Sequence, residues 1–402
     1  MQTAWCVCNT RYNASSMADL TLKYGCNPHQ GNAQLSSNAG PLPVQVLNGT
    51  PSYINIMDAL TAWPLVRELQ ASLGKVAAAS FKHVSPAGAA IEGEVSEAFA
   101  QAQFLDAPPR SAVASAYVRA RGADRVSSFG DAAVVSATVD LELAEILKGE
   151  VSDLIAAPGY DPDALELLKS KRRGGYLILQ IDPDFEPGPL EAREIFGLRL
   201  QQDRNALPIT PEMFRGGPTL PPWVEETMVV ATTALKYTQS NSVSVAAGGQ
   251  VIGMGAGQQS RIHCTRIACA KAEKWMLQTH PKVLALRFPD GVGRPERTNA
   301  VDQYVHWHDL SDPERANLVT TLGYTPEPLT ADEKREWFAS FDELCMSSDA
   351  FIPFRDNVDR AALTGVSYVA HAGGSLRDES VREAAGEMGV TVVETGTRCF
   401  LH

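Results

Sequence analysis

The chain has 402 residues, of which 44% are hydrophobic and 20% are charged, and its formal net charge at pH 7 is −12. This length allows two or three domains, and the acidic balance argues against a general nucleic-acid binder, which would carry a basic footprint. No segment approaches the roughly 20 consecutive apolar residues that a membrane span needs. We therefore expect neither nucleic acid nor a membrane among its partners. Anionic small molecules stay compatible, because a few basic groups can focus a positive field in a cleft.

The N-terminal 20 residues contain no apolar run flanked by positive charge, so they do not resemble a secretory signal. We expect residues 1–20 to form a disordered extension. The seven cysteines are scattered and include no CxxC pair, which argues against a disulfide framework and against a zinc ribbon. Reduced thiols and the lack of a signal together indicate a cytoplasmic protein.

The first predicted elements surround a lysine–histidine pair. Residues 55–74 predict a helix that is kinked at its internal proline and ends at its final glycine. The short apolar run at 76–81 predicts a buried strand. The Ser-Pro pair at 85–86 then supplies an N-cap and a first-turn proline, which predict another helix. Lys82 and His83 would therefore lie between a buried strand and the start of a helix.

Two stretches of the chain look like copies of one α/β unit. Residues 153–182 and 366–395 share the order strand, turn, helix, glycine stop and strand. Each is preceded by a similar short element, at 126–131 and at 346–351. A strand–turn–helix unit in turn precedes each of these elements. We infer an internal duplication rather than a solenoid.

The duplication divides an α/β chain into two halves and an insertion. We assign residues 21–206 to the first half, and residues 207–280 together with 344–402 to the second half. The stretch 281–343 has no counterpart in the first half. It is polar, dotted with prolines and carries two capping boxes of the form Ser/Thr-x-x-Glu. We expect it to be a small helical insertion.

The first candidate for chemistry is the pair Lys82 and His83. Adjacent side chains of a regular strand face opposite ways, so both can serve one pocket only if the chain turns there. A histidine is the natural base near neutral pH, and a neighbouring ammonium can stabilise a developing oxyanion. The structural alternative is a histidine at the edge of the core beside a surface lysine, and the spacing alone leaves it open.

The second candidate is the polar turn at 240–242, followed by a glycine-rich stretch at 253–257 that leads into a helix capped by Ser260. Backbone amides there and the guanidinium of Arg261 could hold a planar polar group, because arginine makes paired contacts better than lysine. The glycine spacing is neither GxGxxG nor a Walker A loop, so it implies no dinucleotide or triphosphate. A glycine-rich hairpin with close packing is the structural alternative.

Two further stretches contain candidate binding groups. Residues 351–361 combine aromatic side chains with Asp356 and Asn357, which could form the wall and the hydrogen-bonding floor for a pterin-like ring. The alternative there is a helix start capped by Asp or Asn. Ser375 and Asp378 follow two glycines and predict a capping box, which is structural unless a ligand lies at that helix N-terminus.

Taken together, these segments resemble the aminoimidazole carboxamide ribonucleotide (AICAR) transformylase family, also called phosphoribosylaminoimidazolecarboxamide formyltransferase. In order along the chain, the similar segments are LKYGCNPHQ, SFKHVSPAGAA, YVRARGADRVSSFGD, VSDLIAAPGY, KYTQSNSV, GAGQQSRIHCTR, SSDAFIPFRDNVDRA and RCFLH. In many organisms this enzyme is the C-terminal part of a bifunctional protein whose N-terminal part is IMP cyclohydrolase. No segment resembles the cyclohydrolase half, so we expect a transformylase without cyclohydrolase activity.

The resemblance implies a fold of two cytidine-deaminase-like, three-layer α/β/α halves with a small helical insertion in the second half. It also implies an obligate homodimer with active sites at the subunit interface, and a separate IMP cyclohydrolase as a functional partner. The zinc signature of true deaminases is absent, because the sequence His83-Val-Ser85 replaces H-x-E and no PCxxC exists. No zinc or other catalytic metal is predicted. The family sometimes carries a structural potassium ion, which the sequence leaves open.

Carried over position by position, the resemblance assigns roles to three sets of residues. The catalytic set is Lys82, His83 and Asn241. The AICAR-binding set is Lys23, Tyr24, Gly130, Asp153, Arg261, Phe351 and Arg398. The folate-binding set is Ile262, Asp356, Ser375 and, with weaker matches, Val126, Phe129, Asn299 and Asn357. Lys23 stands where the family usually has an arginine at a phosphate contact, so the charge is kept but the paired fork is lost.

The implied reaction moves the formyl group of 10-formyltetrahydrofolate to the 5-amino group of AICAR, giving FAICAR and tetrahydrofolate in purine (IMP) biosynthesis. Asn241 and Arg261 would fix the carboxamide of the nucleotide. His83 would accept the amine proton, and Lys82 would stabilise the oxyanion or help protonate the departing folate nitrogen.

Two alternatives were weighed against this reaction. One is a non-catalytic paralogue that binds nucleotide or folate in a regulatory or scaffolding role; the presence of Lys82, His83 and Asn241 disfavours it. The other is a transformylase that uses formyl phosphate, which the absence of any ATP-binding loop disfavours.

Overall fold

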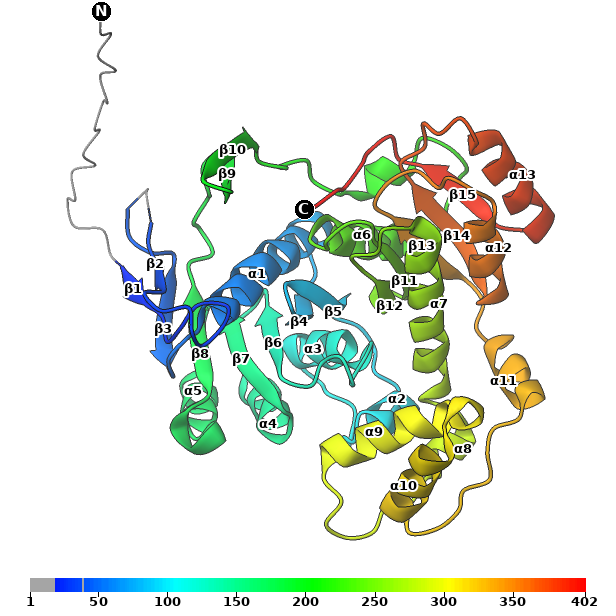
Figure 1. Ribbon diagram of the computed structural model, residues 1–402, viewed down its shortest axis with the longest axis horizontal. Helices are drawn as coiled ribbons and strands as arrows, with labels where there is room; N and C mark the ends of the chain where they lie inside the picture. Colours follow the sequence, from blue (N-terminus) through cyan, green and yellow to red (C-terminus); the bar gives the residue numbers. More distant parts are fainter. Residues whose placement is uncertain (1–18, 38–39) are drawn as a thin grey trace, which may run out of the picture.

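The computed structural model describes residues 19–37 and 40–402. The predicted disorder of the N-terminal extension and the cysteines within it therefore lie outside the described residues, apart from the last two positions of 1–20. Leu20 already begins the short strand β1 (Leu20–Thr21), which pairs antiparallel with β2 (Gln34–Leu35). Figure 1 shows the first half of the chain on the left, the last part on the right, and the helices of the predicted insertion below and between them.

Eleven strands of the described residues form one mixed sheet, in the order β15-β14-β13-β11-β12-β5-β4-β6-β7-β8-β3. The two halves of the sheet meet where β12 and β5 pair antiparallel at Gln250 and Ala90. The alternation of elements thus predicted the α/β class correctly. In sheet order the strands are β15 (Thr391–Glu394), β14 (Val366–His371), β13 (Leu344–Ser348), β11 (Val243–Ala247), β12 (Gln250–Gly255), β5 (Ser85–Ile91), β4 (Ala77–Lys82), β6 (Asp131–Val135), β7 (Ser152–Ala157), β8 (Leu177–Ile181) and β3 (Val44–Asn48).

Helices cover both faces of the sheet, because the side chains of each buried strand alternate between two apolar clusters. In β4, for example, Ala77, Ala79 and Phe81 face one cluster and Ala78 faces the other. One face carries α1 (Tyr53–Leu73) and α6 (Pro222–Lys236), which contact each other. The opposite face carries α3 (Ala112–Gly122), α4 (Leu141–Gly149) and α5 (Pro162–Lys169) in the first half, and α7 (Arg261–Leu277), α12 (Asp356–Leu363) and α13 (Asp378–Met388) in the second half.

The strand order of the two sheet halves is the same when it is followed outward from their junction. The first half runs β5-β4-β6-β7-β8 and the second runs β12-β11-β13-β14-β15. The strand–helix–strand order predicted for 153–182 and 366–395 is confirmed as β7-α5-β8 and β14-α13-β15. The predicted equivalence of the short elements is wrong, since 126–131 precedes β6 whereas 346–351 spans the end of β13.

Glycines allow one helix to approach the junction strand in each half. A side chain at Gly88 of β5 would collide with the carbonyl oxygen of Ala120 in α3. A side chain at Gly255 of β12 would likewise collide with the carbonyl oxygen of Cys264 in α7. Close packing, the structural alternative for the stretch 253–257, therefore explains its first glycines.

The prediction of a helix after Ser85 is wrong. Ser85 begins β5, which forms an antiparallel hairpin with β4 through a two-residue turn. The local Ser-Pro signal is overridden because residues 85–91 are needed between the two helical layers, where a strand can bury both of its faces. Pro86 lies opposite Phe81 at a register shift, the kind of position at which a sheet tolerates proline.

The first long helix is close to its prediction. α1 begins at Tyr53, two residues earlier than expected, because Ser52 and Asn55 form a capping box. The helix continues through Pro64 and ends before Gly74, which has the left-handed conformation of a helix C-cap.

The stretch 281–343 contains four helices with a small apolar cluster of their own. The capping boxes predicted at Ser311 and Thr330 are confirmed at the starts of the third and fourth helices. A separate hairpin of β9 (Leu190–Ile195) and β10 (Leu198–Asp203) extends from the first half (Figure 1). The four helices are α8 (Pro281–Leu284), α9 (Arg294–Val305), α10 (Asp312–Leu322) and α11 (Ala331–Phe338), and a short α2 (Glu97–Ala102) contacts α8.

Candidate active site

The Lys82–His83 pair lies at the turn of the β4–β5 hairpin. Lys82 ends β4 and pairs with Ser85, so His83 and Val84 form the two-residue turn. Both turn residues have positive φ, 53° and 59°. The chain thus reverses immediately after Lys82, which is the condition for both side chains to serve one pocket. The buried carboxylate of Asp58 in α1 accepts a hydrogen bond from the Val84 N–H at 2.6 Å.

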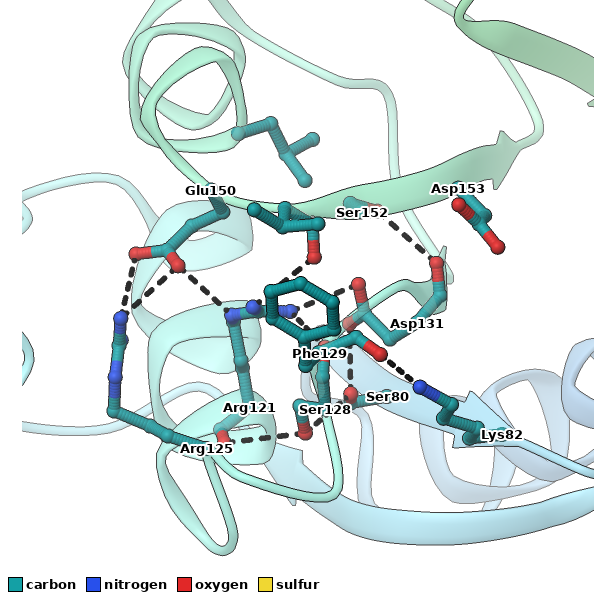
Figure 2. Close-up of polar contacts among 12 residues, drawn as sticks. Ser80, Lys82, Arg121, Arg125, Ser128, Phe129, Asp131, Glu150, Ser152 and Asp153 are labelled. Atoms are coloured by element: carbon teal, nitrogen blue, oxygen red, sulfur yellow. Dashed lines mark hydrogen bonds and ion pairs between the residues drawn. The ribbon is translucent and has the colours of Figure 1, made fainter. Parts of the chain in front are cut away.

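The Lys82 ammonium opens onto a cavity of about 350 Å³ between the first half and α9. Lys82 Nζ donates to the carbonyl oxygen of Phe129 and lies 5.8 Å from the centre of the Phe129 ring. Figure 2 shows the ammonium pointing toward the Phe129 carbonyl, with Asp153 of β7 on the same side. Three residues of the predicted folate set line the same cavity: Val126, Phe129 and Asn299.

A buried carboxylate joins this cavity to the insertion. Glu150 is 5% exposed and accepts hydrogen bonds from three guanidinium groups (Figure 2 shows two of them). Arg121 and Arg125 donate to it from the end of α3 and the following loop, at 3.2 and 3.0 Å. Arg294 donates from α9 at 3.2 Å. Because Arg121 also forms an ion pair with buried Asp131 at 2.8 Å, the network connects the sheet, α3 and the insertion.

The network fixes the charge states of its members. Burial alone would raise the pKa of Glu150, but the neighbouring guanidinium groups of Arg125, Arg121 and Arg294 hold it below its ordinary value. Burial would lower the pKa of Arg121, yet Asp131 and the other acidic neighbours raise it above its ordinary value. Glu150 is therefore held as a carboxylate between guanidinium groups, whereas Lys82 forms no ion pair with any carboxylate of the described residues.

The second candidate group forms around Arg261 at the start of α7. Arg261 is 7% exposed, and its Nη2 donates to Asn241 Oδ1 at 2.9 Å. Its Nη1 forms an ion pair with fully buried Asp349 and donates to the Ser242 carbonyl at 3.2 Å. Asp349 also accepts from the Ser242 N–H at 2.8 Å. The guanidinium therefore orients the Asn241 amide, and its charge is balanced inside the protein.

Members of the predicted folate set lie next to this group at the start of α12. Asn357 is buried, accepts from the Thr265 hydroxyl of α7 at 2.7 Å, and donates to Asp356 Oδ1 at 2.9 Å. Ile262 is the second residue of α7, next to Arg261. The alternative for this stretch, a helix start capped by Asp or Asn, holds only in part: α12 begins at Asp356, but its N-cap is Arg355 and no side chain caps it.

The C-terminal tail completes the surroundings of the polar turn. The Ser240 N–H donates to the Leu401 carbonyl at 3.0 Å, and the Cys399 N–H donates to the Asp349 carbonyl at 2.8 Å. Arg398 is exposed, with its guanidinium 4.7 Å from the centre of the Phe400 ring. The tail thereby brings Arg398 to the same side of the second half as Asn241.

The remaining members of the predicted site are exposed or half-buried. Phe351 follows β13 and is 45% exposed. The Ser375 box is only half realised: Asp378 accepts from the Ser375 N–H at 2.9 Å, but α13 begins at Asp378 itself and the Ser375 hydroxyl accepts from Arg377. The helix starts later than a box at Ser375 predicts, because Arg377 and not Ser375 is its N-cap.

Two predicted nucleotide contacts lie at the N-terminus of α1. The Lys23 N–H donates to the Pro51 carbonyl at 2.9 Å, and the Tyr53 N–H donates to the Tyr24 carbonyl at 3.1 Å. Gly130, in the turn just before β6, lies beside both Lys82 and Asp153. Asp153 is paired with Arg172 at 2.8 Å on the exposed side of β7.

Within one chain, the predicted site residues form two groups. In the described part of the chain, no hydrogen bond, ion pair or ring contact joins Lys82 or His83 to Asn241 or Arg261. Two strands, β5 and β12, separate β4 from β11 in the sheet. Since neighbouring strands lie about 4.8 Å apart, the two groups begin roughly 14 Å from one another.

Sequence reasoning missed the acidic residues that support both groups: Asp58, Glu150 and Asp349. Each contacts residues far away in the chain, and no local pattern marks them. Asp349 is the one of the three that lies within a segment similar to the transformylase family, SSDAFIPFRDNVDRA.

The described residues contain neither a cluster of metal ligands nor a membrane-spanning helix. No group of three or more His, Cys, Asp or Glu side chains there could hold a metal ion. No helix in the same residues is long and apolar enough to cross a membrane.

Comparisons with known proteins agree along most of the chain. A family model described as the AICARFT/IMPCHase bienzyme matches residues 6–271. The bifunctional purine biosynthesis protein PurH of Parasynechococcus marenigrum is 30% identical over 389 residues, which cover 95% of this chain and 59% of that protein. PurH of Synechococcus elongatus is 28% identical over 401 residues, covering 98% and 61%. The chain therefore spans about three fifths of the length of the curated relatives it matches.

Proposed function

The chain belongs to the AICARFT/IMPCHase bienzyme family, and from this premise we propose that it is a formyltransferase of purine biosynthesis. It transfers the formyl group of 10-formyltetrahydrofolate to the 5-amino group of AICAR, giving FAICAR and tetrahydrofolate. The observation that carries the proposal is the position of Lys82. The Lys82 ammonium lines a cavity of about 350 Å³ whose wall includes Phe129 and Asn299. It forms no ion pair with a carboxylate of the described residues.

The difficult part of this reaction is the amine. Its lone pair is delocalised into the imidazole ring and the carboxamide, so the amine is a poor nucleophile. A catalyst must hold it against the formyl carbon and remove a proton as the bond forms. His83, exposed at the hairpin turn, is our candidate for the base. Lys82 stabilises the oxyanion of the tetrahedral intermediate or protonates the departing folate nitrogen.

The Asn241–Arg261 group supplies orientation in this scheme. Arg261 donates a hydrogen bond to Asn241 Oδ1. The Asn241 amide is therefore held in one orientation, in which it can recognise the substrate carboxamide. An arginine already neutralised by Asp349 adds little net charge to the site. This suits a neutral carboxamide better than a phosphate.

We propose that the two groups meet across two copies of the chain, with the Lys82–His83 turn of one copy facing Asn241 and Arg261 of the other. Within one chain they begin roughly 14 Å apart, and no hydrogen bond, ion pair or ring contact of the described residues joins them. A homodimer with a two-fold axis would bring the two groups together in two equivalent sites.

The β9–β10 hairpin supports the dimer. A two-stranded hairpin on its own is marginally stable in water. Here Ile195 and Leu198 lie opposite one another and are 50% and 67% exposed, Leu200 is 59% exposed, and Phe196 is 99% exposed. We propose that a second copy covers them. Sedimentation equilibrium should give twice the mass of one chain, and a monomer at assay concentrations would contradict the proposal.

Other parts of the assignment follow from the family and stay proposals. They are two cytidine-deaminase-like halves related by duplication, the domain limits given above, a cytoplasmic location and a structural potassium ion. A separate IMP cyclohydrolase as functional partner is proposed as well. Formation of IMP from FAICAR by the purified chain would contradict the absence of cyclohydrolase activity.

The decisive assay mixes the purified chain with AICAR and measures FAICAR with and without 10-formyltetrahydrofolate. We expect product only when the folate is present. No product in either case would favour the non-catalytic paralogue. Product formed from formyl phosphate in the absence of folate would favour the alternative transformylase.

A further inference from the structure

The turn that carries His83 has a backbone conformation that its residues disfavour. His83 and Val84 are its two central residues, and both have positive φ. Two-residue turns of this class favour Asn-Gly, Asp-Gly or Gly-Gly, because a side chain at positive φ is strained and a β-branched one most of all. Such strain persists only where the surroundings hold the backbone in place.

Asp58 is the group that holds it. The Val84 N–H donates to Asp58 Oδ1 at 2.6 Å, across 26 positions of sequence. Asp58 is 7% exposed. It forms no ion pair with any residue of 19–37 or 40–402. Burial raises the pKa of its carboxyl. The Val84 N–H and the charges of His83 and Lys82 favour its ionised form, against the opposing charge of Asp153. A buried carboxylate with one backbone hydrogen bond is a costly arrangement unless it serves another purpose.

We propose that Asp58 is a positioning residue for the formyl transfer, whose carboxylate holds the strained turn and so fixes where the His83 side chain lies relative to Lys82. In a continuing strand these adjacent side chains would face opposite ways. The inference rests on the proposed function, because it assigns Asp58 to the same site.

Helix α1 gives this assignment a second connection to the site. Its first residue, Tyr53, donates its N–H to the carbonyl oxygen of Tyr24, a predicted nucleotide contact. Asp58 lies further along the same helix. One rigid element therefore orders both the turn and the loop that carries Lys23 and Tyr24.

The test compares kcat and KM for Asp58→Ala and Asp58→Asn. Removing the acceptor in D58A should lower kcat by about tenfold to a hundredfold, the effect of a small misplacement of catalytic groups. KM for AICAR should change less than about twofold, because Asp58 contacts the turn and not the nucleotide. D58N keeps an acceptor oxygen and should retain most of the activity.

A second substitution separates positioning from loss of stability. Glycine adopts positive φ without strain, so adding Val84→Gly to D58A should raise kcat by about twofold to fivefold. The matched control is Glu68→Ala in the same helix. Glu68 accepts from Ile209, Lys236 and Tyr237, away from the turn. E68A should lower the melting temperature but leave kcat within about twofold of the wild type.

Wild-type kcat in D58A would overturn the proposal. So would a loss of kcat in E68A that matches the loss in D58A, with no rescue by V84G. The hydrogen-exchange rate of the Val84 amide provides a readout that needs no activity, and it should rise in D58A but not in E68A. If the wild-type chain transfers no formyl group, the proposed function fails on its own. An unchanged Val84 exchange rate in D58A would then still refute the role of Asp58.

Discussion

The two groups of candidate site residues treat charge in opposite ways. The Lys82 ammonium is half-buried and forms no ion pair with a carboxylate of the described residues. The neighbouring His83 is exposed. Around Arg261 the basic group is 7% exposed and is paired with an aspartate that is fully buried. The first group can change its contacts without breaking an ion pair. The second cannot do so without breaking the buried ion pair between Arg261 and Asp349.

This difference suggests a division of labour. Groups that move protons must reach the substrate and respond to its charge, whereas groups that recognise a neutral amide need fixed donors and acceptors. The hairpin turn and the polar turn before β11 would thus supply chemistry and orientation, respectively. Substitutions in the first group should therefore lower the catalytic rate, and substitutions in the second should lower stability.

The largest effect on activity is expected in the Lys82–His83 group. His83→Ala should lower kcat by a factor of ~100–10,000, the usual contribution of one acid–base group. Nucleotide affinity should change little, because His83 is not assigned to binding. Steady-state kinetics together with calorimetric titration of AICAR separates the two quantities, and full activity in H83A would remove His83 from the mechanism.

In the Asn241–Arg261 group, we expect a substitution to lower the stability of the protein first. Asp349→Asn leaves the buried Arg261 guanidinium without its counter-charge, which should cost about 3–5 kcal/mol in the free energy of unfolding. Denaturant titration measures it. The matched control is Asp312→Asn, which removes an ion pair with Arg315 on the surface of α10 and should stay within about 0.5 kcal/mol of the wild type. Equal losses in the two variants would contradict the account.

A smaller effect is expected from the network behind the cavity. The pKa of Glu150 is held below its ordinary value of 4.5, so its contribution to stability is complete above that pH and is lost as the pH falls through the lowered folded value. Glu150→Gln should lower stability at pH 7 by about 1.5–3 kcal/mol. The melting temperatures of E150Q and wild type should draw together as the pH falls below 4.5. A constant gap from pH 7 to pH 3 would contradict this assignment.

Much of the fold was accessible from sequence because its signals are local. The strand–helix–strand units at 153–182 and 366–395 show apolar periodicity and glycine stops within some 30 residues. The assignment of Asn241 and Arg261 to one carboxamide site came from the resemblance to a family, and the hydrogen bond between them is consistent with it. The β4–β5 hairpin was missed, since the Ser-Pro pair is a good helix start and only the tertiary environment makes it a strand.

The supporting acidic residues were beyond local reasoning. Glu150 contacts Arg294 across 144 positions, and Asp349 contacts Ser242 across 107. A lone Asp or Glu beside a strand predicts surface exposure from sequence, because its burial depends on partners that only the fold assembles.

Mixing two inactive variants tests most directly whether the groups form one site across two copies of the chain. H83A and Asn241→Ala should each be inactive as homodimers. After the two are unfolded together and refolded at equal concentrations, half of the dimers are mixed, and each mixed dimer holds one intact site of two. The account predicts recovery of about a quarter of the wild-type activity. Mixed dimers that form but have no activity would contradict a site shared between subunits.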